Sequence, residues 1–370
     1  MEEKFLIRDL INPQSILEIA ERIVNSYPEF DGDNFFKEIN KKLPSLEYKQ
    51  RVDFVADKLD EFLPKDYPTA IRIINKSLTS ELPNKEESNY NNFYIVIYNK
   101  YIINNGIDYF DLSMESLLLQ TKRLTSEFGI RVFLDKYTEL SFKLLKTWTQ
   151  SDNIHIRRLC SEGCRPRLPW AMRLNKFIDN PLLVIEILEL LKYDNEMYVR
   201  RSVANNLNDI SKDHPNLVIN LLSKWHDGSK NMNWLINHAL RTLIKKGNKK
   251  ALELIGFPEK PKIDISNFKF EDDRCKIGDE IYFSFELKSK LKQKLMIDYS
   301  VGFVKANGNN SSKIFKLSKK ELKKGEVIKI RKKQSFKNYS TRTIYPGIHN
   351  IELQINGNLI GKIEINVTRD

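Results

Sequence analysis

The side chains best suited to do chemistry in this sequence gather in the stretch from Ser151 to Trp170, which reads S-D-N-I-H-I-R-R-L-C-S-E-G-C-R-P-R-L-P-W. One carboxylate, Glu162, stands among arginines, and the stretch ends on a proline and a tryptophan. A carboxylate set among arginines makes a poor general phosphate binder, because it repels the phosphate. It suits a ligand that is itself partly cationic, since a carboxylate and an aromatic face both stabilise positive charge. The arginines are Arg157, Arg158, Arg165 and Arg167.

The first half of this stretch has the pattern of a helix. Asp152 is a plausible N-cap, and apolar residues follow at helical spacing. Arg158 and Glu162 are four residues apart, so they would share one face of that helix. Gly163 and Pro166 are expected to end it. The same pattern also fits a plain corner between two helices with a solvated ion pair.

A second carboxylate, Asp209, falls in a segment that repeats this theme. Arg201, Asn205 and Asp209 are spaced four residues apart and share one face of a predicted helix. The string Asp152-x-x-x-Ile-Arg-Arg recurs as Asn195-x-x-x-Val-Arg-Arg at an offset of 43 residues. Paired helices that repeat about every 40 residues are typical of HEAT-like repeats, which stack into a superhelix with a concave binding face.

The run Ser161–Trp170 resembles the AlkC branch of the AlkC/AlkD family of DNA glycosylases, which remove alkylated bases. Three further strings are similar to the same family: T-S-E-F-G-I-R from Thr125, Y-V-R-R-S-V-A-N-N-L-N-D-I-S-K-D-H-P from Tyr198, and N-W-L-I-N-H-A-L-R-T-L-I-K-K-G from Asn233. The resemblance is strong from Thr125 to Phe257. It implies an α superhelix of HEAT-like repeats, followed in some members by an all-β immunoglobulin-like sandwich.

The resemblance also implies roles for individual residues. Glu162 corresponds to the family's central catalytic carboxylate, and Glu127 and Asp209 correspond to its other two acidic site residues. Trp170 corresponds to an aromatic that packs near the lesion, and Arg158 to a cationic residue that binds substrate. Plainer alternatives are a helix cap for Glu127, a surface charge for Asp209 and a core position for Trp170.

The implied activity is hydrolysis of the N-glycosidic bond of cationic N3-alkylated bases in duplex DNA, above all 3-methyladenine, without a cofactor. The charged base is already a good leaving group, so no strong general acid is required. Breaking the bond develops positive charge on the sugar, which carboxylates stabilise, and a carboxylate can position the attacking water. The family further implies that the lesion stays largely stacked instead of being fully flipped out.

Charge is spread unevenly along the chain. The net charge is +12, but residues 1–121 hold 14 Lys and Arg against 21 Asp and Glu, residues 122–256 hold 23 against 14, and residues 257–370 hold 24 against 14. Two basic thirds favour a nucleic acid as the partner over a membrane surface, and the resemblance implies that this nucleic acid is double-stranded DNA. The residues predicted to contact DNA are Arg157, Arg165, Arg167, Arg201, Asn205, His238, Arg241, Lys245 and Lys332.

The composition indicates which features we expect the protein to lack. No apolar run approaches the roughly 20 residues of a membrane span, and no secretory signal is apparent at the start of the sequence. Three cysteines (Cys160, Cys164 and Cys275) and five scattered histidines form neither a disulfide framework nor a zinc motif. We therefore expect a cytoplasmic monomer without a metal.

The pattern of apolar residues predicts two domains. Residues 1–257 read as a HEAT-like helical repeat catalytic domain, with single helices over Arg131–Thr149, Trp170–Phe177 and Met232–Lys246 among others. Residues 258–370 hold seven short alternating segments separated by turn signals, which is typical of an immunoglobulin-like β-sandwich.

A lysine-rich segment from Lys313 to Lys337 lies within the predicted sandwich. Alternation would place Lys329, Arg331 and Lys333 on one face of a strand, where they could clamp the phosphates of a duplex. A solvated, solubilising surface is the commoner use of such lysines.

Two other classes of function stay open on the sequence alone. The protein could be a non-catalytic nucleic-acid-binding HEAT-repeat protein, or a scaffold that binds other proteins. Glu162 and Asp209 argue against the first, because a phosphate binder gains nothing from carboxylates in its groove. The basic excess argues against the second.

Overall fold

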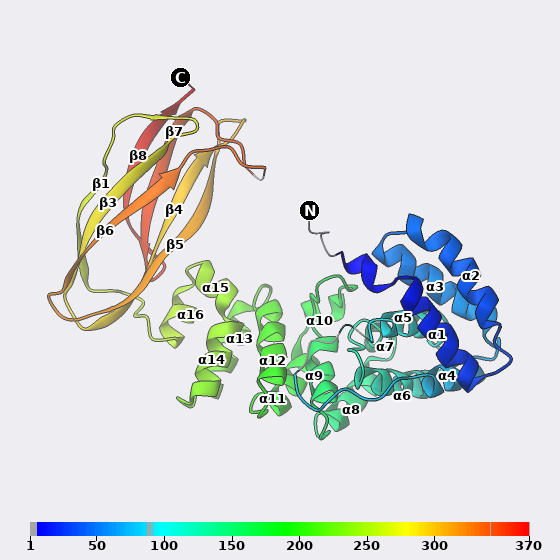
Figure 1. Cartoon of the computed structure of the whole chain (residues 1–370). Helices are drawn as coiled ribbons and strands as arrows, with labels where there is room; N and C mark the ends of the chain where they lie inside the picture. The colour runs from blue at the N-terminus through cyan, green and yellow to red at the C-terminus, as the bar shows by residue number, and fades with distance from the viewer. Residues whose placement is uncertain (1–5, 87–89, 91, 341, 370) are drawn as a thin grey trace. The chain divides into compact units, whose positions relative to one another are not determined.

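The computed structural model describes residues 6–86, 90, 92–340 and 342–369. Helices come first and strands follow, so the predicted fold class, helical repeats before an immunoglobulin-like sandwich, is confirmed (Figure 1). The contacts divide the chain into two compact units, Met1–Asp213 and His214–Asp370. The change from helix to strand falls between Leu254 and Ile263. The domain boundary at residue 257 stays a prediction, because the helices after Asp213 share a unit with the strands.

The first unit consists of helices, and the apolar faces of these helices are buried. The helices are α1 (Pro13–Ser26), α2 (Gly32–Lys42), α3 (Tyr48–Phe62), α4 (Tyr67–Lys76), α5 (Ile95–Asn105), α6 (Phe110–Thr121), α7 (Arg131–Lys136), α8 (Thr138–Trp148), α9 (Ile154–Gly163), α10 (Asn175–Asp179), α11 (Leu182–Leu191) and α12 (Met197–Ile210), with 3-10 turns η1 (Ile7–Leu10) and η2 (Leu43–Ser45).

Helices α9 and α12 pack against each other and carry the predicted chemistry. The side chain of Asn153 accepts hydrogen bonds from two backbone N–H groups, so Asn153, and not the predicted Asp152, is the N-cap of α9. Helix α12 begins 43 residues after α9, which matches the predicted repeat offset. Helix α9 ends at Gly163, where a Cβ would come within 2.7 Å of the Ile130 side chain. Glycine therefore allows the close packing of this helix end.

Two helix predictions in the first unit are wrong. The segment Arg131–Thr149 is divided into α7 and α8 at Tyr137, whose φ of −119° and ψ of 52° lie outside the helical region. The segment from Trp170 has no helix until α10 begins at Asn175. Trp170 itself has a φ of 67°, a left-handed conformation that cannot belong to a right-handed helix.

The second unit begins with four helices, α13 (Pro215–Trp225), α14 (Lys230–Ala239), α15 (Arg241–Lys245) and α16 (Lys249–Leu254). The predicted helix Met232–Lys246 is interrupted at Leu240, between α14 and α15. The strands are β1 (Ile263–Phe270), β2 (Cys275–Lys276), β3 (Glu280–Ser289), β4 (Gln293–Val304), β5 (Asn310–Leu322), β6 (Val327–Ser335), β7 (Gly347–Ile355) and β8 (Asn358–Thr368).

These strands form a sandwich of two sheets with the orders β1-β3-β6 and β2-β8-β7-β4-β5. Neighbouring strands are antiparallel except for β2 and β8. Inward-facing side chains such as Phe283, Val301 and Leu353 are fully buried. All seven predicted strands are present. The eighth, β2, has two residues and is too short for an alternating pattern to reveal.

The turn between β7 and β8 ties the sandwich to the helices before it. Asn356 and Gly357 have φ values of 48° and 77°, as a two-residue Asn-Gly hairpin requires. A Cβ on Gly357 would clash with the carbonyl oxygen of Gly247, in the turn before α16. Asn356 Nδ2 also donates to the Pro258 carbonyl at 2.9 Å. These contacts explain why α13–α16 and the sandwich belong to one unit.

Candidate active site

Glu162 lies in the last turn of α9 and is 5% exposed. Its Oε1 accepts a hydrogen bond from Arg165 Nη1 at 2.6 Å, and its Oε2 accepts one from Ser202 Oγ at 2.6 Å. The Arg158 guanidinium lies 3.8 Å from the same Oε1. Each carboxylate oxygen can accept two hydrogen bonds. Glu162 therefore keeps capacity for a further donor, such as a water molecule.

Arg158 connects Glu162 to Glu127, which lies in the loop before α7. Arg158 Nη1 is 2.8 Å from Glu127 Oε2 and donates to Thr125 Oγ1 at 3.0 Å. Thr125 Oγ1 in turn donates to Glu127 Oε2 at 2.9 Å. The guanidinium carbon of Arg158 lies 5.0 Å from the centre of the Tyr198 ring. The N-cap of α7 is Ile130 and not Glu127, so the interpretation of Glu127 as a helix cap is wrong.

Asp209 lies on α12 and is 2% exposed, so it is not a surface charge. Its Oδ2 accepts a hydrogen bond from Arg165 Nε at 2.9 Å, and its Oδ1 accepts one from Lys212 Nζ at 2.8 Å. Arg165 therefore bridges the carboxylates of Asp209 and Glu162. We call the connected set the carboxylate–arginine cluster; its members are Glu127, Arg158, Glu162, Arg165 and Asp209.

Charge pairing in this cluster determines the protonation state of Glu162. Burial would raise the pKa of the Glu162 carboxyl, but Arg158, Arg165 and the Ser202 hydroxyl outweigh burial and hold that pKa below its usual value. Burial would likewise lower the pKa of Arg158, whereas Glu127 and Glu162 raise it. Glu162 is therefore ionised at neutral pH and cannot act as a proton donor.

A loop between Gly163 and Met172 carries both Arg165 and Trp170, and Arg131 holds it in place. Arg131 is fully buried and donates to the carbonyl oxygens of Gly163 at 2.7 Å, Arg165 at 2.8 Å and Met172 at 2.6 Å. Burial lowers the pKa of Arg131 to about 10. One side chain thus fixes the backbone at both ends of the loop.

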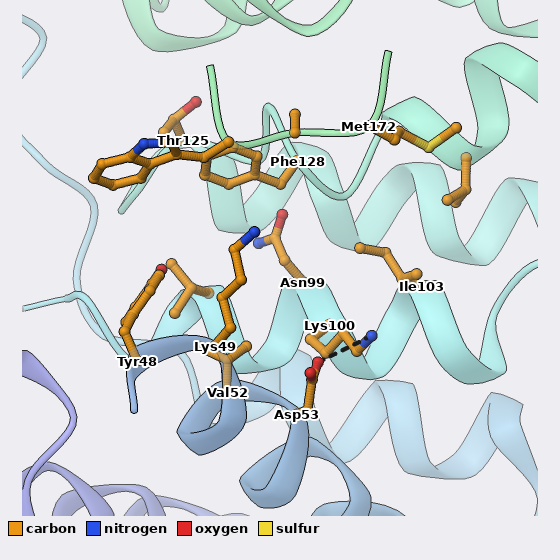
Figure 2. A pocket seen from close by; sticks show the side chains of 14 residues that line it. Tyr48, Lys49, Val52, Asp53, Asn99, Lys100, Ile103, Thr125, Phe128 and Met172 are labelled. Atoms are coloured by element: carbon orange, nitrogen blue, oxygen red, sulfur yellow. Dashed lines mark ion pairs between the residues drawn. The ribbon is translucent and has the colours of Figure 1, made fainter. Parts of the chain in front are cut away.

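Trp170 is 68% exposed, so the core alternative for it is wrong. Its positive φ is a strained conformation that persists only where neighbouring contacts enforce it. Trp170 borders a hollow of about 300 Å³, which Figure 2 shows from close by. We call this the Trp170 hollow; it is lined by Tyr48, Lys49, Val52, Asp53, Val96, Asn99, Lys100, Ile103, Thr125, Phe128, Val132, Trp170, Ala171 and Met172. Thr125 belongs to the hollow and also contacts the carboxylate–arginine cluster.

The structure therefore brings together the three predicted carboxylates and Arg158. Trp170 is connected to them indirectly: it lines the same hollow as Thr125, and it lies on the loop that Arg131 holds. Four residues of this arrangement were not predicted: Thr125, Arg131, Tyr198 and Ser202. They lie in the strings that carry the family resemblance, and that was the only signal for them. Threonine, arginine, tyrosine and serine occur in many structural roles, so their residue types alone do not indicate a site. Their contacts depend on how α9 and α12 pack against each other.

Four arginines predicted to contact DNA are engaged in ion pairs within the first unit. One is Arg165, which pairs with Glu162 and Asp209 in the carboxylate–arginine cluster, and the other three pair outside it. Two of these pairs are bidentate, with donor–acceptor distances between 2.6 and 3.1 Å, and the third measures 2.6 Å. The pairs are Arg157 with Asp194, Arg167 with Asp213 and Arg201 with Glu86. Asn205 is half-buried on α12. A phosphate would have to share or displace the carboxylates, so DNA contact by these residues stays a prediction.

The other predicted DNA contacts lie in the second unit. The His238 ring stacks on Trp234 with 5.0 Å between ring centres, and Arg241 Nη1 donates to the His238 carbonyl. Lys245 and Lys332 are exposed. The predicted clamp face of the sandwich carries a glutamate for each cation: Lys329 pairs with Glu286, Arg331 with Glu271 and Lys333 with Glu280. Clamping of DNA by this face stays a prediction.

Metal and thiol chemistry find little support in the described part of the chain. There, no three His, Cys, Asp or Glu side chains cluster in a way that could hold a metal ion. Cys160 and Cys164 are buried, and burial raises the pKa of Cys164 to about 12. No helix within the described ranges has both the length and the apolar character to cross a membrane.

Comparisons with known proteins cover both parts of the chain. Residues 125–243 match the family described as DNA alkylation repair enzyme, and residues 264–369 match the C-terminal Ig-like domain of uncharacterised protein YhaZ. Uncharacterized protein YhaZ of Bacillus subtilis (strain 168) is 34% identical over 362 residues, which are 98% of this chain and 99% of that protein. The solved structure of Pseudomonas fluorescens alkylpurine DNA glycosylase AlkC, bound to DNA containing an abasic site analog, is 35% identical with a TM-score of 0.82. That match covers 97% of this chain and 99% of the other.

Proposed function

Since this chain belongs to the AlkC-type DNA alkylation repair enzymes that carry a C-terminal Ig-like domain, we propose that it is a DNA glycosylase. Its substrates are cationic N3-alkylated bases in duplex DNA, above all 3-methyladenine. The candidate catalytic residues are Glu162, Asp209 and Glu127, and the candidate substrate-binding residues are Trp170 and Arg158.

The pairing of the buried Glu162 carboxylate with Arg158, Arg165 and Ser202 is the observation that carries this proposal. A glycosylase that removes a neutral base must usually protonate it, and a carboxyl with a lowered pKa cannot do so. An N3-alkylated adenine is already cationic and leaves without protonation. A permanently charged carboxylate next to the sugar then stabilises the positive charge that develops there. The electrostatics of the cluster thus match one class of lesion and not the other.

The reaction balances with water as the only co-reactant. The bond between C1′ of the sugar and the base nitrogen breaks, and its electron pair neutralises the base. A water oxygen bonds to C1′, and the proton of that water passes to a carboxylate or to solvent. Glu162 is suited to orient this water, because its oxygens keep acceptor capacity beyond Arg165 and Ser202.

We include in the proposal that the cationic base is not fully flipped into a pocket. The hollow that adjoins the cluster is lined by Lys49, whose charge opposes a cationic base, and by Lys100, whose charge Asp53 largely offsets. Trp170 is exposed and can meet the lesion at the surface of the duplex. An aromatic face toward a cation is favourable without enclosing it.

Single-turnover excision of 3-methyladenine from methylated duplex DNA tests the proposal. Glu162→Gln keeps the shape of the side chain and removes its charge, so the rate should fall by about 10²–10³-fold, as for loss of one preorganised electrostatic group. DNA affinity should stay equal or rise, because one negative charge is lost. Glu139→Gln, at an exposed position on α8, is the matched control and should excise at the wild-type rate.

A second substrate separates this mechanism from general base removal. DNA that carries hypoxanthine, a neutral lesion, should not be processed, since no proton donor serves it. Wild-type rates in Glu162→Gln would show that the carboxylate takes no part in catalysis. Binding of DNA without any excision would instead indicate the alternative, a non-catalytic nucleic-acid-binding protein.

A further inference from the structure

We infer that the Trp170 hollow binds the free purine base after the glycosidic bond has been broken. The ligand is then a neutral N3-alkyladenine, and its identity rests on the proposed function. The volume of about 300 Å³ falls at the lower end of the range for small-molecule sites and suits a two-ring base. The hollow thus serves as an exit site for the product.

The walls of the hollow suit a flat aromatic ligand. Tyr48, Phe128 and Trp170 contribute aromatic rings from three separate segments, and the remaining lining is mainly aliphatic. Every nucleobase has a π face that stacks on aromatic side chains, independent of its hydrogen-bonding edge. Burial raises the pKa of Tyr48, so its phenol stays neutral and can accept or donate a hydrogen bond.

Asn99 adds a polar group to the middle of the hollow, as Figure 2 shows. It is 3% exposed, and its Nδ2 donates to Gln120 Oε1 at 2.9 Å and to the Ile95 carbonyl at 3.1 Å. Its Oδ1 has no hydrogen-bond partner among the described residues. That oxygen is itself buried and faces Gly129, on which a Cβ would lie 2.5 Å from it, so Asn99 contributes to the wall of the hollow but does not present this oxygen to a ligand.

The charge of the lining favours the product over the substrate. Lys100 Nζ lies 3.1 Å from Asp53, which largely offsets its charge, and Lys49 adds a second ammonium group at the wall (Figure 2). The N3-alkylated base is cationic while it is attached to the sugar, so the Lys49 ammonium disfavours it. Bond cleavage delivers an electron pair to the base and makes it neutral. The hollow therefore becomes favourable for the base only after the reaction.

The hollow also adjoins the carboxylate–arginine cluster through Thr125. Thr125 lines the hollow and donates to Glu127, while it accepts a hydrogen bond from Arg158. Trp170 borders the hollow and is the residue proposed to meet the lesion. A base released at the cluster would therefore lie close to the hollow.

Isothermal titration of the full-length protein with free 3-methyladenine, in the absence of DNA, tests the inference. A ligand of this size should bind with a Kd on the order of 100 µM to 1 mM. Val52→Phe on α3 and Val96→Phe on α5 place a ring in the hollow from two different helices, and both residues are only half-buried, so the fold should tolerate them. Each should weaken binding by at least about tenfold. Val327→Phe, on an exposed strand position, is the control and should bind like the wild type.

Two results would overturn the inference: no binding at millimolar base, or unchanged affinity in both filled variants with intact circular dichroism spectra. Neither depends on catalysis. A protein that excises 3-methyladenine but does not bind the free base would refute the exit site alone. A protein that binds the base in the hollow but excises nothing would refute the proposed glycosylase and leave a purine site.

Discussion

Replacing Trp170 with glycine should impair excision much more than it impairs folding. A core tryptophan truncated to alanine costs about 3–5 kcal/mol, but Trp170 is 68% exposed and has a φ of 67°. The folded state therefore loses little contact with the ring. It also gains by the change, because glycine adopts a positive φ without strain.

The magnitude follows from these two quantities. A tryptophan buries up to about 250 Å² when enclosed, and here about a third of that is covered, which at about 25 cal/mol per Å² contributes roughly 2 kcal/mol. The left-handed backbone costs a non-glycine residue about 1 kcal/mol, which glycine restores. The net loss of stability is thus about 1 kcal/mol. For a unit of this size that corresponds to a decrease in Tm of about 2–4 °C.

The expected loss of activity is larger. An aromatic face toward a cation contributes about 1–2 kcal/mol when partly desolvated, so single-turnover excision should slow by about 5–30-fold. Trp170→Phe keeps a ring face and should retain more activity than Trp170→Gly. Tyr193→Gly, which removes another exposed aromatic from the same unit, should leave excision unchanged.

Thermal denaturation and single-turnover excision, measured on the same preparations, check this reasoning. Equal losses of activity in the Phe and Gly variants would show that the ring face is not what matters. A decrease in Tm as large as that of a core truncation would show that the exposed position does not describe the protein in solution. Either outcome would make packing the better account of Trp170.

Four other predictions address protonation, loop position, the sandwich and DNA contact. The pKa of Glu162 is lowered in the folded state, so its ion pairs stabilise the fold at pH values above the unfolded pKa of 4.5. This stabilisation is lost as the pH falls through the folded-state pKa. The rate of excision should therefore stay constant from neutral pH down to about pH 4.5. Arg131→Lys keeps the charge but not the fork that reaches three carbonyl oxygens, so excision should slow about tenfold while DNA affinity, measured by anisotropy, stays the same. Burial raises the pKa of Asp298 to about 6, so its ionised form destabilises the fold increasingly as the pH rises from 3.8 to about 6; Asp298→Asn should add about 2–3 kcal/mol in denaturant unfolding at neutral pH and nothing below the unfolded pKa. Lys332→Gln should reduce the salt slope of DNA binding by about 0.9, and Lys329→Gln, whose ammonium already pairs with a glutamate, should reduce it less.

Much of the site was predictable because it depends on local periodicity. The offset of 43 residues marks α9 and α12 as repeat equivalents, and helical spacing places Arg158, Glu162 and Asp209 on their faces. The bridging role of Arg165 was not predictable, because it depends on a loop that follows the end of α9. The role of Arg131 depends on contacts 32 to 41 residues away along the chain. The left-handed conformation of Trp170 was not predictable, because a positive φ is rare for a tryptophan.

The sandwich shows the same division between local and non-local information. Alternation predicted seven strands and placed Lys329, Arg331 and Lys333 on one face. It could not predict that Glu286 lies directly opposite Lys329, because that depends on the register between β3 and β6. Cross-strand pairs decide whether a row of lysines is available to a phosphate or already neutralised. The register is set by packing across both sheets, which the sequence of one strand does not contain.

The arginines around Glu162 are better understood through the carboxylates than through DNA. A lone glutamate at 5% exposure would take up a proton, because burial favours its neutral form. Arg158 and Arg165 prevent this and offset the negative charge that would otherwise repel the phosphates of a duplex. In the proposed reaction, the carboxylate would already be ionised and oriented when positive charge develops on the sugar, so no reorganisation would be needed. The contacts that keep Glu162 charged also deprive it of a proton to donate, and for that reason the site should act only on bases that leave without one.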